Sequence, residues 1–123
     1  MVLENKLSLE KFKPNVLREY DIRGIVGQDL SQNTALTIGR TFGHIVIKKF
    51  IGKKIVVGYD GRLTSQNFHD SLCEGLLDSG ADVVSIGLGP TPMTYFANFH
   101  LEAVAAIMVT GSHNPSEYNG FKM

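Results

Sequence analysis

The 123-residue sequence has a single cysteine, no excess of either charge and no long apolar run. Cys73 cannot form an internal disulfide, so a reducing cytoplasm is the expected location. Twelve basic residues balance twelve acidic ones, which argues against nucleic acid or an anionic membrane as the main partner. No segment approaches the roughly 18 apolar residues of a transmembrane helix. Residues 1–6 lack the basic start and apolar segment of a secretory signal.

What is present has the composition of an ordinary globular domain. Hydrophobic residues make up 43% of the chain and charged residues 20%, so a whole-chain description as disordered is excluded. A chain of this length corresponds to about one domain and can bury a core. Cys73 lies in an apolar helical stretch, where a small buried thiol is expected rather than a nucleophile.

Strand patterns alternate with helical patterns along the chain. Strands are predicted at 20–26, 54–60, 82–87 and 103–109, with helices at 32–51, 65–79 and 92–101. This alternation predicts an α/β fold with three α/β/α layers and a mainly parallel, mixed sheet of about four strands. Residues 1–17 show no strong period and are interpreted as an N-terminal arm, held by Phe12, Val16 and Leu17.

Capping residues predict where the helices begin and end. Ser31 is expected to cap the first helix, Thr64 or Ser65 the second, and Thr91 the third, with Pro92 in its first turn. Gly52 is a plausible stop for the first helix. Two glycines four residues apart in that helix, at positions 39 and 43, would allow close packing on the sheet.

Polar loops follow the predicted strands, at 24–27, 58–62, 87–91 and 110–115. If the strands are parallel, all four loops lie at one edge of the sheet, where α/β proteins place their sites. The last loop carries a hydroxyl, an imidazole and a carboxamide in succession, at Ser112, His113 and Asn114. Gly111 is expected to permit backbone angles closed to other residues. On residue types alone, an ordinary polar turn is equally consistent with this stretch.

Asp21 and Arg23 alternate with apolar residues in the first predicted strand, which places both on one face. On its own, this pattern favours a structural ion pair at the end of a strand.

Four ordered motifs and a fifth segment give the chain a family resemblance. They are Arg-Glu-Tyr-Asp-Ile-Arg-Gly at 18–24, Gly-Tyr-Asp-Gly-Arg at 58–62, Pro-Thr-Pro at 90–92, Thr-Gly-Ser-His-Asn-Pro at 110–115 and Tyr-Asn-Gly-Phe-Lys at 118–122. From about residue 18 to its end the chain resembles the first domain of the α-D-phosphohexomutases. It is most similar to the bacterial phosphomannomutase/phosphoglucomutase branch. The phosphoglucosamine mutases match less well, because they tend to begin with a Thr-Asp-Gly variant of the first motif.

The resemblance implies that residues 18–123 are phosphohexomutase domain I and that Ser112 carries a phosphoryl group. The implied enzyme is an isomerase of the phosphotransferase type. It would convert mannose or glucose 1-phosphate to the 6-phosphate, and back, through a hexose 1,6-bisphosphate that also serves as activator. The family pattern implies Mg²⁺ held through the phosphate of Ser112, with its remaining ligands outside this chain.

The resemblance also suggests roles for basic residues near Ser112. Arg23 and Lys122 match basic active-site residues of the family and are expected to face phosphate, with Lys122 also a candidate proton shuttle. His113 is expected to orient a sugar hydroxyl or exchange a proton with it near pH 7. The N–H groups around Ser112 could form an anion nest for the phosphoryl oxygens.

Four further residues are expected to bind phosphate or substrate or to support the serine loop. Asn114 is interpreted as a hydrogen-bonding residue that fixes the loop, and Tyr20 belongs to the first motif. Asp60 and Arg62 could support the loop from the neighbouring strand end, although a purely structural role is equally consistent with their positions.

Two other classes of function compete with this interpretation. A serine hydrolase is disfavoured because adjacent side chains such as Ser112 and His113 diverge, and because the chain lacks the Gly-x-Ser-x-Gly elbow. A non-catalytic sugar-phosphate-binding or scaffold module is a serious alternative. The family's Asp-x-Asp-x-Asp metal loop, its sugar-recognition loop and its C-terminal phosphate-binding domain do not occur in these 123 residues.

We therefore interpret the chain as an N-terminal piece of a mutase, incomplete at its C-terminus and inactive alone. Its expected partners are a hexose phosphate and the remaining domains of the same enzyme. An exposed edge on the final strand, near Lys122, together with an uncovered sheet face, would favour self-association.

Overall fold

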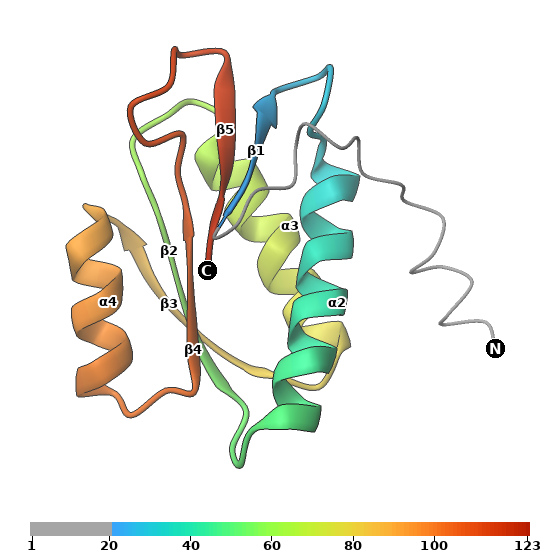
Figure 1. The fold of residues 1–123 in the computed structure, drawn as a ribbon, viewed down its shortest axis with the longest axis vertical. Helices are drawn as coiled ribbons and strands as arrows, with labels where there is room; N and C mark the ends of the chain where they lie inside the picture. The colour runs from blue at the N-terminus through green and yellow to red at the C-terminus, as the bar shows by residue number, and fades with distance from the viewer. Residues whose placement is uncertain (1–20) are drawn as a thin grey trace, which may run out of the picture.

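The computed structural model describes residues 21–123, so the arm at 1–17 and Tyr20 lie outside the described residues. Helices and strands follow one another in the order predicted from the sequence (Figure 1). The elements are β1 (Asp21–Ile25), α2 (Gln32–Lys49), β2 (Lys54–Tyr59), α3 (Ser65–Asp78), β3 (Asp82–Leu88), α4 (Thr91–His100), β4 (Ala105–Val109) and β5 (Tyr118–Lys122).

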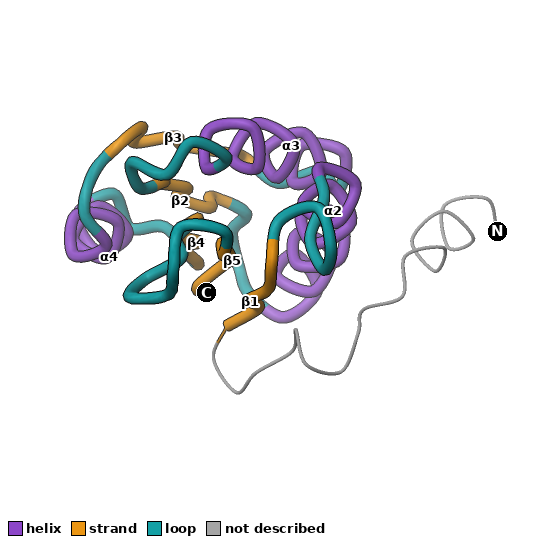
Figure 2. Tube along the Cα trace, turned by 90° about the horizontal axis from the view of Figure 1, so that it is seen from above, coloured by secondary structure: helices purple, strands orange, loops and turns teal. Residues whose placement is uncertain are grey.

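The strands form one mixed sheet in the order β1-β5-β4-β2-β3. β2, β3 and β4 are parallel, whereas β5 is antiparallel to both of its neighbours, β1 and β4. As a result β1 runs in the same direction as β4. Helices α2 and α3 lie on one side of the sheet and α4 on the other (Figure 2). The predicted α/β/α fold is confirmed, with five strands because residues 118–122 pair as an additional antiparallel strand.

The expected exposed edge on the final strand is wrong. β5 lies inside the sheet, where Phe121 pairs with Ile22 of β1 on one side and with Val109 of β4 on the other. Among the described strands, β1 and β3 form the edges. Self-association stays a prediction, and pairing through β5 cannot be its basis.

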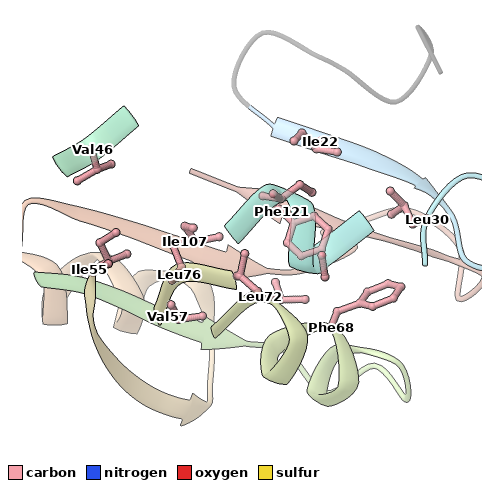
Figure 3. Close-up of a cluster of buried hydrophobic side chains, with 14 residues drawn as sticks. Ile22, Leu30, Val46, Ile55, Val57, Phe68, Leu72, Leu76, Ile107 and Phe121 are labelled. Carbon is pink, nitrogen blue, oxygen red and sulfur yellow. The ribbon is translucent and has the colours of Figure 1, made fainter. Parts of the chain in front are cut away.

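The main core fills the space between the sheet and the α2–α3 pair. Alternate strand residues face these helices, because side chains alternate between the two faces of a strand (Figure 3). Phe121 is fully buried there, with its ring centroid 5.9 Å from that of Phe68 on α3. The strand residues are Ile22, Ile55, Val57, Ile107, Val109 and Phe121, and the residues that meet them include Leu30, Ile38, Val46, Phe68, Leu72 and Leu76.

The caps predicted for the helix starts are confirmed only in part. Ser31 caps α2 as predicted, and its side chain exchanges hydrogen bonds with Thr34 in a capping box. Thr64 occupies the cap position of α3 but makes no side-chain capping bond. The cap of α4 is Pro90, so Thr91 is its first helical residue and not its cap. The two residues that depart from the prediction, Thr64 and Thr91, lie next to the loops that follow β2 and β3.

Helices α2 and α3 touch backbone to backbone at two glycines, Gly39 and Gly75. A Cβ added to Gly39 would collide with the carbonyl oxygen of Leu72, and one added to Gly75 with that of Leu36. A Cβ at Gly43 would collide with the Ser79 side chain, just beyond α3. The glycines therefore allow close packing against α3, whereas the sequence suggested packing against the sheet.

We predict that Gly75→Ala destabilises the domain, because the two helices must separate to admit the methyl group. Overpacking of this kind costs about 1–3 kcal/mol, although the better helix propensity of Ala offsets up to about 1 kcal/mol. Urea unfolding followed by circular dichroism measures the change. Gly61→Ala is the control, because its methyl group would meet nothing within 4 Å. Equal midpoints for the two variants would contradict the prediction.

Cys73 is a free, half-buried thiol on α3, and its sulfur lies 3.6 Å from Nε2 of His69. His69 is itself held by Ser85 of β3, with Nε2 and Oγ 2.8 Å apart. Burial, with a smaller contribution from the Asp70 carboxylate, raises the pKa of Cys73 to about 11. The thiol is therefore protonated at neutral pH and is not a nucleophile there, as the sequence suggested.

The raised pKa predicts slow alkylation of Cys73. Against an ordinary value of 9.0, a pKa near 11 lowers the thiolate fraction at neutral pH by about a hundredfold, and the rate follows the thiolate. Iodoacetamide labelling followed by mass spectrometry from pH 7 to pH 11, with a short unfolded cysteine peptide as control, measures this. If the alkylation rate of Cys73 levels off near pH 9, as the rate of the peptide does, the raised pKa of Cys73 is refuted.

No helix within residues 21–123 has both the length and the apolar character needed to cross a membrane. A cytoplasmic location stays a prediction.

Candidate active site

The loops after β1, β2, β3 and β4 lie at one edge of the sheet, because these four strands share one direction. Backbone hydrogen bonds join neighbouring loops directly. The N–H of Asp60 donates to the carbonyl of Val109 over 3.0 Å, and that of Gly89 donates to the carbonyl of Tyr59 over 3.0 Å. Next to β1, the N–H of Val26 donates to the carbonyl of Glu117 over 2.9 Å. The predicted loop edge is confirmed.

Residues 110–115, here called the serine loop, present Ser112 to solvent. Ser112 has φ of 54°, in the left-handed region, which is uncommon for a residue other than glycine. Its N–H donates to the hydroxyl of Thr110 over 2.9 Å, and the N–H of Asn114 donates to the carbonyl of Gly111 over 3.0 Å. The exposed hydroxyl therefore sits on a strained but internally bonded turn.

Arg23 approaches the serine loop from β1 and is buried, with 4% of its surface exposed. Nη1 donates to the carbonyl of Gly111 over 3.0 Å and to Oδ1 of Asn114 over 2.9 Å. Nη2 pairs with the Asp21 carboxylate at 2.8 Å, so the expected ion pair on this strand is present. Nε is buried without a hydrogen-bond partner among residues 21–123. Arg23 thus contacts both neighbours of the Ser112–His113 pair while keeping one donor unused.

Asp60, at the end of β2, anchors the start of the serine loop. One carboxylate oxygen accepts from the hydroxyl of Thr110 over 2.8 Å and from the N–H of Gly111 over 3.2 Å. The other oxygen accepts from the Ser65 hydroxyl and from the N–H of Arg62. Burial alone would raise the pKa of Asp60, but these four hydrogen bonds together lower it below its usual value.

Arg62 binds the serine loop from the side of β2. Nη1 donates to the carbonyls of Pro115 over 2.7 Å and Tyr118 over 3.1 Å, and Nη2 donates to those of Ser112 over 3.1 Å and Asn114 over 2.7 Å. Nε lies 3.5 Å from the Asp60 carboxylate. Both residues that were considered as loop supports therefore bond to the loop.

The special backbone angles expected for Gly111 are not found, so that prediction is wrong. The positive φ belongs to Ser112, and Gly111 is not among the glycines with positive φ. A Cβ at Gly111 would collide with the guanidinium of Arg62. The missing side chain therefore makes room for Arg62.

Lys122 lies on the same face of the sheet as Arg23. Lys122 pairs with Asp21 of β1 and with Met108 of β4, so alternation places it on the sheet face opposite the buried Phe121. Gly120, two residues earlier on that face, pairs with Arg23 and accepts the N–H of Thr110 over 2.9 Å. Lys122 is partly exposed and His113 is exposed. Their expected chemical roles stay predictions.

Three polar residues make contacts at the site that the sequence did not predict, namely Thr110, Ser65 and Asn119. Thr110 bonds both Asp60 and the N–H of Ser112. Asn119 of β5 is fully buried and donates to the hydroxyls of Thr64 and Ser65, which ties β5 to the start of α3. The available signal was a polar residue at a strand position, since a buried polar group requires partners.

An open cleft of about 730 Å³ lies beside the serine loop, and its walls include Asp60, Arg62, Asn114 and Glu117. Ser112, Arg23 and Lys122 are not among its lining residues, so the cleft is not assigned to substrate.

We predict that Asp60→Asn destabilises the fold at neutral pH and much less in acid. A carboxyl whose pKa is lowered by folding adds stability above its unfolded pKa of about 3.9, and that stability is lost as the pH falls through the folded pKa. At pH 7 the loss should be about 1–3 kcal/mol, as for other buried hydrogen-bonded groups.

Urea unfolding of the wild type and the variant at pH 7 and pH 3 tests this prediction. Asp78→Asn is the control, because Asp78 forms an exposed pair with Arg40 and should change stability by less than about 1 kcal/mol. A difference between wild type and Asp60→Asn that is the same at both pH values would count against it.

Known proteins resemble this chain along most of its length. The family described as phosphoglucomutase/phosphomannomutase, alpha/beta/alpha domain I, matches residues 14–123. A phosphomannomutase of Klebsiella pneumoniae is 47% identical over 106 residues, which are 86% of this chain and 65% of that protein. A phosphomannomutase/phosphoglucomutase of Pseudomonas aeruginosa is 44% identical over 110 residues, which are 89% of this chain and 23% of that protein.

A crystal structure of a phosphoglucomutase/phosphomannomutase family protein from Burkholderia thailandensis superposes with a TM-score of 0.83 at 38% identity. The match covers 92% of this chain and 26% of the other. The chain thus spans less than two thirds of each of these relatives. It belongs to the phosphoglucomutase/phosphomannomutase family and has the fold of that family's α/β/α domain I.

Proposed function

We propose that this chain carries the phosphoryl-bearing serine of an enzyme that interconverts hexose 1-phosphates and hexose 6-phosphates. The observation that carries the proposal is the environment of Ser112. The hydroxyl is exposed on a turn bonded by the buried guanidinium of Arg23, which retains an unused Nε donor. A cation bonded to the loop that carries an exposed serine suits a phosphoryl group, because catalysis of phosphoryl transfer depends on positioning and charge neutralisation.

The proposed reaction moves one phosphoryl group in each half. In the first half, the bond between phosphorus and Oγ of Ser112 breaks, and a bond forms to a free hydroxyl of the hexose phosphate. The sugar hydroxyl loses its proton and Oγ of Ser112 gains one, giving a hexose 1,6-bisphosphate. In the second half, the other phosphoryl group of that bisphosphate returns to Ser112. The net result is an isomerised sugar phosphate and a phosphorylated enzyme.

Three side chains have proposed roles in these steps. Arg23 and Lys122 neutralise charge on the phosphoryl oxygens, and Lys122 can also relay the proton between the sugar hydroxyl and Oγ. His113 orients the sugar hydroxyl or exchanges a proton with it, for which an imidazole is suited near pH 7. Arg23 and Lys122 lie on one face of the sheet, Arg23 bonds to the serine loop, and His113 is next to Ser112 in that loop, which supports these roles.

The described residues do not fit a metal site of their own. Residues 21–123 contain no group of three His, Cys, Asp or Glu side chains able to hold a metal ion. The Mg²⁺ expected in this family would therefore reach this part of the chain only through the phosphate of Ser112. No step of the proposed reaction is assigned to it.

The proposed substrate class is hexose phosphate, without a choice between mannose and glucose. The relatives are named as phosphomannomutases, as phosphoglucomutases or as both. The proposal includes the expectation that the 123-residue chain alone shows no mutase turnover, which a coupled assay with mannose 1-phosphate or glucose 1-phosphate measures.

We predict that the chain, joined to the remaining domains of a relative and incubated with glucose 1,6-bisphosphate, gains one phosphate on Ser112. Intact-mass measurement shows the addition and peptide mapping locates it. Ser112→Ala should abolish it, whereas Ser116→Ala, at an exposed serine just after the same loop, should leave it unchanged. Phosphate mapped to another residue, or no incorporation into the folded multidomain protein, would refute the assignment of Ser112.

A further inference from the structure

Arg62 bonds to three carbonyl groups of the serine loop and to one just after it. Its two terminal nitrogens hold four carbonyl oxygens, of Ser112, Asn114, Pro115 and Tyr118. A guanidinium has its donors in a rigid planar fork, so it can hold several carbonyls in one fixed arrangement. The Asp60 carboxylate near Nε, at 3.5 Å, fixes the other end of that fork.

The direction of one of these carbonyls matters for Ser112. In a trans peptide the C=O and the following N–H point in opposite directions, and the described chain has no cis peptide. Because the carbonyl of Ser112 points to Arg62, the N–H of His113 points away from it. Within residues 21–123, that N–H finds no acceptor. It is thus available to an anion on the side of the loop opposite Arg62.

Gly111 and Arg62 depend on each other. The guanidinium lies where a side chain at residue 111 would stand, so any larger residue displaces it. Since Gly111 has no positive φ, an alanine there meets no backbone penalty and acts only through this displacement. The backbone of residue 111 also remains tied to Asp60 and to Arg23.

We propose that Arg62 and Gly111 form one positioning unit that turns the N–H of His113 toward the phosphoryl group on Ser112. Arg62 is a positioning residue and does not touch the phosphoryl group. The inference rests on the proposed function, since it assumes that Ser112 carries phosphate. It adds that the serine loop binds phosphate through the backbone N–H of His113, and that Arg62 fixes the direction of this N–H from the opposite side of the loop.

Titration of the ¹⁵N-labelled chain with inorganic phosphate, followed at the amide of His113, tests the proposal. The wild type should show a saturable shift of this amide. Arg62→Ala should weaken phosphate binding by about tenfold, the effect of losing one charge-assisted hydrogen bond. Arg62→Lys should weaken it almost as much, because lysine keeps the charge but lacks the fork. A role through charge alone predicts instead that Arg62→Lys binds like the wild type.

Gly111→Ala provides the second arm, because it keeps the charge of Arg62 and moves the guanidinium. It should also weaken phosphate binding by about tenfold, and in the Arg62→Ala background it should add less than about twofold, since it acts through the missing side chain. Arg40→Ala is the matched control, because Arg40 pairs with Asp78 and has no contact with the loop. It should bind phosphate like the wild type.

Three outcomes would overturn the proposal. They are wild-type affinity in Arg62→Lys, additive losses from Arg62→Ala and Gly111→Ala, and no response of the His113 amide to phosphate in the wild-type chain. Arg62→Lys retains a cation at this position, so it keeps the test decisive if Arg62→Ala does not fold. Mass mapping of Ser112 can succeed while this titration fails, which separates the failure of this inference from that of the proposed function.

Discussion

The hydrogen bonds of the Asp60 carboxylate are the interaction on which the site depends. This one side chain joins the end of β2 to the serine loop through Thr110 and Gly111, and to the start of α3 through Ser65. Its partly buried charge is stabilised by donors from each direction, which is why the pKa of Asp60 is lowered despite burial. The entry of the serine loop is therefore fixed by a strand that is not its neighbour in sequence.

The direction of β1 is the second constraint, and β5 sets it. Because β5 runs antiparallel between β4 and β1, the strand that bears Arg23 is parallel to the strand that ends in the serine loop. Arg23 pairs with Gly120, whose carbonyl accepts the N–H of Thr110. Eighty-eight residues separate Arg23 from the Gly111 carbonyl that it binds, so sheet topology rather than local sequence brings this cation to the site.

The sequence was sufficient for the features that depend on local pattern, and insufficient for those that depend on pairing. Periodicity located four strands and the three helices of residues 21–123, and the parallel crossovers predicted the common loop edge. A final strand near Lys122 was predicted, but pattern could not place β5 inside the sheet, because that position depends on its pairing with β1 and β4. The role of Gly111 was wrong for the same kind of reason, because the group that occupies its space comes from a residue 49 positions earlier. Buried Asn119 was missed because its partners lie at the start of a helix on another segment.

The two arginines that hold the serine loop each have a carboxylate partner, Arg23 with Asp21 and Arg62 with Asp60. A non-glycine residue at positive φ, such as Ser112, persists only where its surroundings fix the backbone firmly, and these neutral pairs fix it from both sides. Positioning is thus achieved with little net charge. Within residues 21–123 no carboxylate lies within ion-pairing distance of the Lys122 ammonium. Of the two basic residues proposed to face a phosphoryl group, Lys122 is therefore the one whose charge is not already compensated by a carboxylate within this part of the chain.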